Sequence, residues 1–221
     1  EAELEYNNEH VSRSIYVGFG VMALPPALTA QYPALAALVD RLSLLIWTTT
    51  PWTIPGNRAV CYSDRISYGL YEITQAENDF GPQPGDRLIF GDNLAEESAR
   101  KAKVVFDRLA DVTPDQLAES SLSHPLATMK VDGYDFTVPL LQGDHVTDDA
   151  GTGFVHTAPS HGRDDFEIWM ACAKQIDRQG ISTTIPFTVD DGGYYTEDAP
   201  GFVGARVIDD KGKKGDANQK V

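Results

Sequence analysis

The stretch LSLLIWTTTPWTIPGNR, residues 42–58, decides how this chain folds around its most informative motif. It opens as an apolar run typical of a buried strand and continues into three consecutive threonines. Pro51 then removes a backbone donor and forces the chain out of the sheet, which leaves the threonine hydroxyls free for a ligand or water. The plainer interpretation is also open: threonine-rich strand ends are common, and Trp47 and Trp52 would then be core aromatics.

On both sides of this stretch, most segments of the sequence are short and typical of β-strands. They are expected at residues 14–21, 42–50, 59–62, 68–73, 87–90, 129–131, 135–141, 154–156, 185–189 and 194–196. This predicts a mainly β fold with α elements, a closed β-barrel core carrying helices on its outside. We expect residues 1–221 to form one domain cut out of a larger enzyme, with linker-like ends at 1–5 and 211–221.

Three helices are expected. One begins near Asn93, a good N-cap, and continues through apolar residues at helical spacing: Leu94, Ala102, Val105 and Leu109. A short helix begins at Thr113-Pro114, with proline in its favoured first position. The third follows Gly162 and places five apolar residues on one face: Phe166, Trp169, Met170, Ala173 and Ile176.

The amino-acid composition limits the kinds of protein to which this chain can belong. The chain has 221 residues, of which 42% are hydrophobic and 23% charged, and its formal net charge of -15 argues against a freestanding nucleic-acid binder. Cys61 and Cys172 lie far apart without a CxxC spacing, which is typical of a reduced cytosolic protein without a zinc site.

A second motif, DAGTGFVHTAPSHGRDDF, spans residues 149–166. Its glycines let the backbone approach a ligand closely, and His156 ends a strand. Asp164 and Asp165 fall in the first turn of the helix that follows, where a carboxylate is held ionised and could grip an ammonium group. An ordinary capping preference explains Asp164 equally well, whereas Asp165 could serve either purpose.

A metal-dependent hydrolase built on His156, His161, Asp164 and Asp165 is a further alternative, although two histidines five positions apart match no standard metal motif. A serine triad is disfavoured because no serine lies in a G-x-S-x-G elbow. The remaining histidines are expected at the surface or in loops: His10, His124 and His145.

Together the two motifs resemble the editing domain of isoleucyl-tRNA synthetases. The resemblance lies in TTTPWTIP (48–55) followed by Asn57, and in GDHVT (143–147), residues 149–159, His161-Gly162 and Asp164-Asp165. Valyl and leucyl enzymes carry Arg-Pro where this chain has Thr50-Pro51. Gly56 stands where alanine is frequent and Ser160 where an acidic residue is frequent, and the motifs for amino-acid activation are absent.

The resemblance implies an editing hydrolase that clears valine from the 3′ end of tRNA(Ile), and valyl-adenylate as well, while excluding isoleucine. It implies catalytic roles for Asp165, which would bind the α-ammonium, for His156, which would reject isoleucine and contact the ribose, and for Thr49 and Thr50. It implies substrate-binding roles for Thr48, Trp52, Thr53, Asn57, Gly151, Thr152 and Gly153.

The resemblance also implies the setting of this domain. We expect no metal and no cofactor in it, whereas the full-length enzyme would use ATP and Mg. The expected partners are the tRNA(Ile) 3′ end and the catalytic core of the same polypeptide, in the cytoplasm, with no membrane contact and a monomeric domain. An inactive spacer or binding module, and the metal-dependent hydrolase, remain the alternatives.

Overall fold

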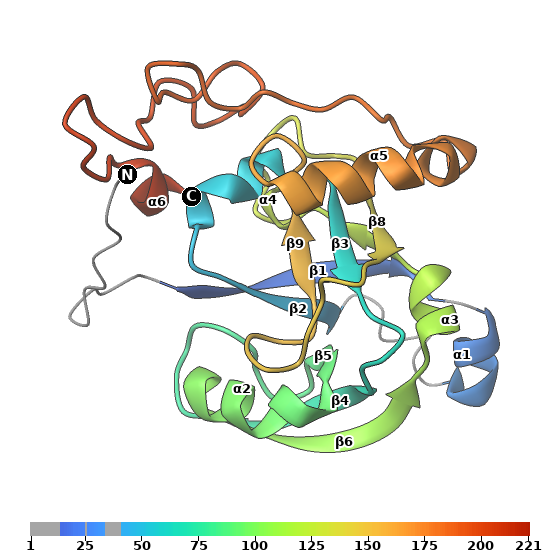
Figure 1. The fold of residues 1–221 in the computed structure, drawn as a ribbon. Coiled ribbons are helices and arrows are strands. Elements are labelled where there is room, and N and C mark those ends of the chain that lie inside the picture. The colour runs from blue at the N-terminus through green and yellow to red at the C-terminus, as the bar shows by residue number, and fades with distance from the viewer. Residues whose placement is uncertain (1–13, 25, 34–40) are drawn as a thin grey trace.

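A computed structural model describes residues 14–24, 26–33 and 41–221 (Figure 1). The expected linker at residues 1–5 lies outside these ranges. The strands are β1 (Ile15–Ala23), β2 (Leu42–Thr48), β3 (Ala59–Tyr62), β4 (Tyr68–Ala76), β5 (Arg87–Gly91), β6 (Val104–Val112), β7 (Ser121–Ser123), β8 (Thr137–Gln142) and β9 (Val155–Thr157). The helices are α1 (Pro26–Gln31), η2 (Pro51–Gly56), η3 (Asp92–Leu94), α2 (Ala95–Ala102), α3 (Pro114–Ala118), α4 (Pro125–Thr128), α5 (Arg163–Arg178) and α6 (Ala217–Lys220).

The strands form one mixed sheet in the order β6-β4-β5-β2-β1-β7-β8-β3-β9. β1 connects its two halves, because residues 15–20 pair with β2 whereas Val21 and Ala23 pair with β7 in a shifted register. The β2–β5 and β3–β8 pairs are parallel, and the other pairs are antiparallel. The mainly β character with peripheral helices is therefore confirmed.

The expected closed barrel is wrong for the part of the chain that is described. β6 and β9 are the two ends of the sheet, and no strand pairing joins one end to the other. β9 is only three residues long and runs into Ala158-Pro159, so its free edge is too short to close the sheet. The loop before β9 reaches β5 through a single backbone hydrogen bond, from Gly91 N–H to the carbonyl of Thr152.

Two apolar clusters lie against this sheet. The larger one is packed under α5 and around β3 and β8, and it includes the fully buried Trp169. The smaller one lies between α2 and the β4-β5-β2 part of the sheet, around Tyr71 and Phe90, whose rings stack 4.4 Å apart. No helix among the described residues is long and apolar enough to cross a membrane.

Several local predictions differ from the structure. The helix expected through Leu109 ends at Ala102, because Lys103 adopts a left-handed conformation and starts the exposed strand β6. On α5, Trp169 and Ile176 are buried, whereas Phe166 and Met170 are 45% and 52% exposed. Residues 129–131, 185–189 and 194–196 form no strand; Val189 and Tyr195 make only an isolated bridge, as do Tyr194 and Arg206.

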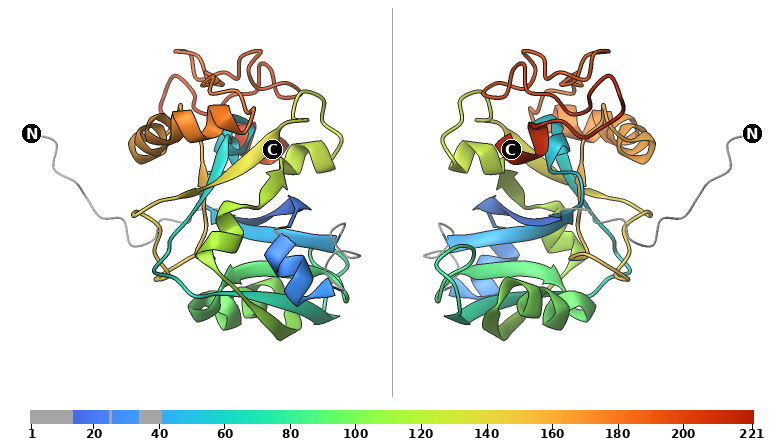
Figure 2. Two further views of the ribbon diagram at one scale, coloured as in Figure 1. Left: turned by 90° about the vertical axis from the view of Figure 1, so that its right-hand side faces the viewer. Right: turned by 90° about the vertical axis from the view of Figure 1, so that its left-hand side faces the viewer.

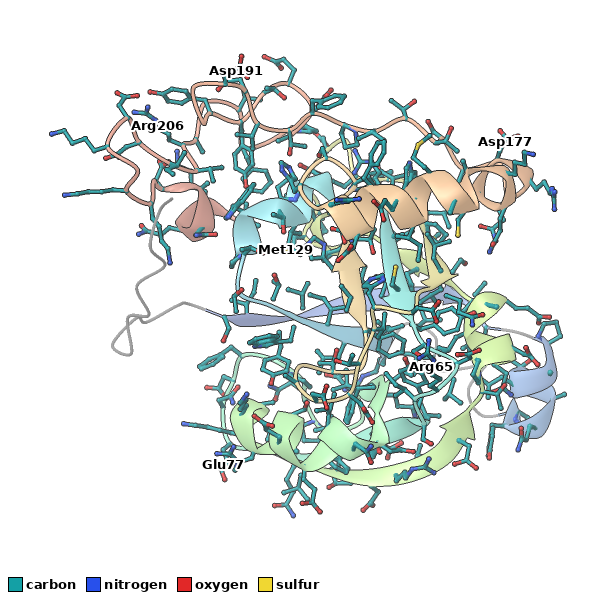
Figure 3. The ribbon with its side chains drawn as sticks, viewed as in Figure 1. Arg65, Glu77, Met129, Asp177, Asp191 and Arg206 are labelled. Carbon is teal, nitrogen blue, oxygen red and sulfur yellow. The ribbon has the colours of Figure 1, made fainter. Side chains whose placement is uncertain are left out.

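The long segment that follows α5 has little regular structure but is held by turns and bridges. It runs along the outer side of α5 and returns to α6, which lies beside η2 (Figures 1 and 2). Figure 3 shows Asp191 and Arg206 on this segment, on the far side of the molecule from Glu77. The C-terminal residues, for which the sequence predicts a linker-like end, thus carry a short helix next to the threonine motif.

Candidate functional site

The threonine motif forms a tight turn at the end of β2. The hydroxyl oxygens of Thr48 and Thr50 lie 3.2 Å apart, and the Thr48 hydroxyl also accepts the Thr50 N–H at 3.1 Å. The chain then enters the 3₁₀ helix η2, in which the Thr53 N–H and hydroxyl both donate to the Thr50 carbonyl. Thr48 is buried, whereas Thr49 and Thr50 are exposed, so the last two hydroxyls can reach a bound molecule.

His156, the middle residue of β9, lies against this turn. Its Nε2 is 2.7 Å from the Thr53 hydroxyl, and its Nδ1 is 3.1 Å from the Asn57 side-chain nitrogen. Asn57 is completely buried and donates a second hydrogen bond to the Ala59 carbonyl, which fixes the orientation of its amide. Residues about 100 positions apart in the sequence therefore form one polar cluster.

This geometry assigns the protonation state of His156. The Asn57 amide nitrogen can only donate, so Nδ1 must be the acceptor and the ring proton must lie on Nε2. Nε2–H then donates a hydrogen bond to the Thr53 oxygen, and the Thr53 hydroxyl donates one to the Thr50 carbonyl. Burial and the neighbouring His161 lower the pKa of His156 to about 4, which agrees with a neutral ring.

Asp165 lies in the first turn of α5 and reaches back to the loop after β9. One of its carboxylate oxygens accepts the Ala158 N–H at 2.9 Å. Desolvation raises the pKa of this carboxyl above its usual value, although the Ala158 hydrogen bond and nearby His145 oppose the rise. Asp164 is exposed, so the two neighbouring carboxylates have different environments, and only Asp165 is fixed to the backbone two residues beyond His156.

The glycine-containing loop at residues 151–153 is held by the other half of the sheet. Gly151 and Gly153 both have positive φ, near +80°, which favours glycine. The Gly153 carbonyl accepts the Tyr68 hydroxyl at 2.7 Å, and Thr152 is fully buried. No hydrogen bond of the described chain joins these three residues to the cluster of Thr50, Thr53 and His156.

Trp52 is the residue of the turn with the most distant partners. Its ring meets the ring of His161 edge to face, with centroids 4.9 Å apart, and His161 Nε2 lies 2.6 Å from the hydroxyl of buried Thr188. Its backbone N–H and carbonyl are bound by Asn218 and Tyr195. Neither partner has a sequence signal that points to the site, because Tyr195 follows a turn in an irregular segment and Asn218 lies in a polar stretch near the end of the sequence.

His124 was also missed, since a histidine before proline was expected in a surface loop. It is instead fully buried at the start of α4, and its Nε2 lies 3.1 Å from the Ile54 carbonyl within η2. Stacking on Tyr134 completes its contacts, and burial lowers its pKa to about 3. His124 therefore supports the threonine turn from the core side as a neutral ring.

The residues that the structure describes offer no ligand set for the metal-dependent hydrolase. Among the described residues, which include His156, His161, Asp164 and Asp165, no three histidine, cysteine or carboxylate side chains are grouped closely enough to hold a metal ion. A cavity of about 670 Å³ lies elsewhere, between α2 and the β5-β2-β1 face, and it is lined by none of the candidate site residues.

Sequence relatives agree with the motifs. The chain is 55% identical over 227 residues to an isoleucine–tRNA ligase of Agrobacterium fabrum, 56% over 236 residues to that of Mesorhizobium japonicum and 51% over 222 residues to that of Rhodopseudomonas palustris. Each match covers the whole chain but only 21–24% of the relative, so the chain spans about a fifth to a quarter of their length. No protein-family model matches the sequence.

Solved structures agree on the fold. The editing domain of the P. knowlesi cytosolic leucyl-tRNA synthetase aligns with a TM-score of 0.54 and 12% identity, over 97% of this chain and 78% of that one. The crystal structure of GlLeuRS-CP1 aligns with a TM-score of 0.53 and 21% identity, over 76% of this chain and 63% of that one. At these identities the likeness establishes the fold.

Proposed function

We propose that this chain, which is 55% identical to a segment of an isoleucine–tRNA ligase and has the fold of an editing domain, hydrolyses valine wrongly esterified to tRNA(Ile). A synthetic site distinguishes valine from isoleucine by one methylene, which is worth only about 1–3 kcal/mol, and isoleucyl-tRNA synthetase is the standard illustration of that limit. A second, hydrolytic site that excludes the larger amino acid removes the error. Valyl-adenylate is a second substrate under this proposal.

The observation that carries the proposal is the chain of hydrogen bonds from Thr50 through Thr53 to His156 and Asn57. It holds an imidazole ring at the edge of a strand-end turn whose outer threonines, Thr49 and Thr50, are exposed. A ring fixed at both nitrogens is suited to excluding a side chain by size, because it cannot swing away to admit a larger one. Size exclusion is what an isoleucine-sparing hydrolase requires.

His156 is poorly suited to act as a general base. Its lone-pair nitrogen already accepts from Asn57, and its lowered pKa makes the ring a weak acceptor of a further proton. Thr49 and Thr50 would instead orient the attacking water together with backbone groups and the free ribose hydroxyl of the substrate. The rate then arises from positioning and from polar groups already in place, which can supply several kcal/mol of barrier lowering.

Asp165 would bind the α-ammonium group of the aminoacyl ester. One of its oxygens is held by Ala158, which fixes the carboxylate direction, and the other has no hydrogen-bond partner among the residues described. A desolvated carboxylate attracts a cation more strongly than an exposed one, since fewer waters compete. The matched neighbour, Asp164, is exposed and lacks this arrangement.

The net charge of -15 fits a domain that meets only the 3′ end of the tRNA while the rest of the ligase, its partner under this proposal, holds the tRNA body. Isolated, the domain would then bind tRNA weakly. Tight and strongly salt-dependent binding by this chain alone would contradict that division of labour.

The deciding experiment compares hydrolysis of Val-tRNA(Ile) and Ile-tRNA(Ile) by this chain, by Asp165→Asn and by Asp164→Asn. Asparagine at 165 keeps an oxygen for Ala158 but removes the charge, so it tests the ammonium contact without loosening the loop. We expect selective loss of valine with the wild type and with Asp164→Asn, and a rate reduced at least tenfold with Asp165→Asn. Equal rates for Asp165→Asn and the wild type would remove the ammonium-binding role.

The same assay separates the alternatives. A chelator should leave the rate unchanged if the site uses no metal, whereas loss of activity restored by zinc would support the metal-dependent hydrolase. No hydrolysis of either ester, by this chain or by a full-length ligase carrying it, would favour an inactive binding or spacer module.

A further inference from the structure

Both backbone polar groups of Trp52 are bound by residues far along the chain. The Trp52 N–H donates to the side-chain oxygen of Asn218 at 3.0 Å, and the Trp52 carbonyl accepts the Tyr195 hydroxyl at 2.5 Å. These partners lie 166 and 143 positions away in the sequence. The N–H groups of the first helical turn have no partner inside the helix and are satisfied by side chains, water or ligands; here distant side chains of the fold bind both polar groups of one peptide residue.

The two partners are themselves firmly placed. Tyr195 is almost fully buried, burial raises the pKa of its hydroxyl, and the group therefore remains a proton donor. Asn218 is on α6, whose first residue, Ala217, is buried and donates its N–H to the Arg206 carbonyl. Figure 1 shows α6 directly beside the turn that follows β2.

A third contact of the same segment acts on the Trp52 ring indirectly, through His161. His161 Nε2 is 2.6 Å from the Thr188 hydroxyl, and the His161 ring packs edge to face on Trp52. Thr188 is fully buried, and its carbonyl accepts the Thr196 N–H, so it is tied to the strand bridge that carries Tyr195. The segment 188–218 thus holds the peptide and the ring of one residue.

The contacts of Trp52 bear on the site because Trp52 lies between Thr50 and Thr53 in the turn. The Thr50 carbonyl accepts hydrogen bonds from both the N–H and the hydroxyl of Thr53, and the Thr53 oxygen accepts one from His156 Nε2–H. A movement of the Trp52 peptide would therefore change the place of the Thr53 hydroxyl and release the His156 ring.

We propose that Tyr195 and Asn218 are positioning residues for amino-acid selectivity: by clamping the Trp52 peptide they fix the place of the His156 ring. The proposal rests on the proposed editing function and deepens it, since neither residue touches the substrate in this scheme. Loss of the clamp would allow the ring to yield to isoleucine, while the polar groups that hydrolyse the valyl ester remain.

The test uses four variants and two controls. Asn218→Ala removes the acceptor, Asn218→Asp keeps an oxygen there, Tyr195→Phe removes the donor, and the double variant Asn218→Ala with Tyr195→Phe removes both. Gln219→Ala and Tyr194→Phe are matched controls, because each alters an adjacent side chain with no hydrogen bond to the turn. Two quantities are measured: the ratio of Val-tRNA(Ile) to Ile-tRNA(Ile) hydrolysis, and amide hydrogen exchange of residues 50–57.

Each single loss is expected to lower the valine-to-isoleucine ratio about two- to tenfold, the effect of one neutral hydrogen bond. The change should come through faster hydrolysis of the isoleucyl ester, with kcat for the valyl ester nearly constant. Exchange in residues 50–57 should rise in the same variants, and Asn218→Asp should restore both quantities toward the wild type.

Unchanged exchange in the double variant would overturn the clamp, and raised exchange with an unchanged ratio would overturn its role in selectivity. If the wild type hydrolyses neither ester, the proposed function fails on its own, and the exchange measurement still decides whether Tyr195 and Asn218 hold the turn.

Discussion

His156 Nε2 lies 2.7 Å from the hydroxyl oxygen of Thr53, and this contact joins the two motifs of the chain. It is short for an N–H···O hydrogen bond, and Asn57 fixes the opposite nitrogen of the same ring. Both ring nitrogens therefore have partners, and under our proposal the ring is a fixed boundary of the pocket and not a general base.

Replacing Thr53 tests directly whether its hydroxyl holds the His156 ring in place. Thr53→Val removes the hydroxyl that accepts from His156 and donates to Thr50, whereas Thr53→Ser keeps it. We expect Thr53→Val to lower the valine-to-isoleucine hydrolysis ratio by about five- to tenfold, equivalent to about 1 kcal/mol, and Thr53→Ser to remain close to the wild type. Equal ratios for valine and serine at this position would show that the hydroxyl does not hold the ring.

The pH dependence of hydrolysis should follow Asp165 rather than a histidine. Its pKa is raised by desolvation, so the ionised form that binds an ammonium is lost as pH falls through that raised value. His156 stays neutral well below pH 6.5, since its pKa is about 4. The rate of valyl-ester hydrolysis should therefore show an acid limb that is absent in Asp165→Asn. A limb centred near 6.5 that disappears in His156→Gln would contradict this assignment.

Stability should also fall on acidification, through two histidines whose pKa values are lowered in the folded state. His124 and His156 have folded-state pKa values of about 3 and about 4, below the value of about 6.5 expected for the unfolded chain. Their contribution is complete above pH 6.5 and is lost as pH falls, because the unfolded state takes up protons first. We expect a loss on the order of 2 kcal/mol for each at pH 5.

Urea unfolding between pH 7.5 and 5.0 measures this loss. His124→Asn and His156→Gln cannot titrate there, so each should make the free energy of unfolding less dependent on pH. A pH profile that keeps its full slope in both variants would assign the effect to other groups.

Gly153 of the second motif and Gly180, which follows α5, offer a matched pair of substitutions. Gly153 has φ near +79°, and an added Cβ would lie 3.2 Å from the Cα of Gly91. Gly180 has a similar φ of +74° with nothing within 4 Å. Gly180→Ala should cost about 1 kcal/mol of unfolding free energy from backbone strain alone, and Gly153→Ala clearly more. Equal losses in urea unfolding would show that the approach to Gly91 is not tight.

Prediction from sequence succeeded where local signals and tertiary packing agree. Ala59–Tyr62 forms the strand its β-rich composition indicates, and Thr113 caps α3 with the expected proline at the first helical position. The helix after Gly162 is likewise present as α5. In these segments the pattern comes from residues that are buried or that bond their own backbone.

It failed where exposed residues imitate a pattern. Val105 and Leu109 continue the helical spacing of α2, yet both lie on the solvent side of β6, at 51% and 44% exposure. The left-handed Lys103 that separates the two elements has no sequence signature comparable to glycine. The closed barrel failed for a different reason, because pairing between distant strands depends on edge length and local bends, which composition does not encode.

For the candidate site, sequence could identify the two motifs but not what surrounds them. The resemblance to editing domains selected His156 and the threonines, and the structure brings Thr53 and Asn57 into contact with His156. The supporting residues His124, Tyr195 and Asn218 could not be found from sequence, because their partners are backbone atoms of η2. Nearly every residue has the same backbone N–H and carbonyl groups, so a sequence pattern does not show which of them a distant side chain will bind.

The strand order has a consequence for how the chain is made. β3 lies between β8 and β9, so the half of the sheet beside the threonine turn cannot assemble until about 100 further residues have been synthesised. The Asn218 contact comes later still, 166 residues after Trp52. Contacts between residues so far apart in the sequence slow folding, because the entropy of closing a long loop is lost before the contact can form. A nascent chain would therefore carry the threonine turn through about 100 further residues of synthesis before His156 could lie against it.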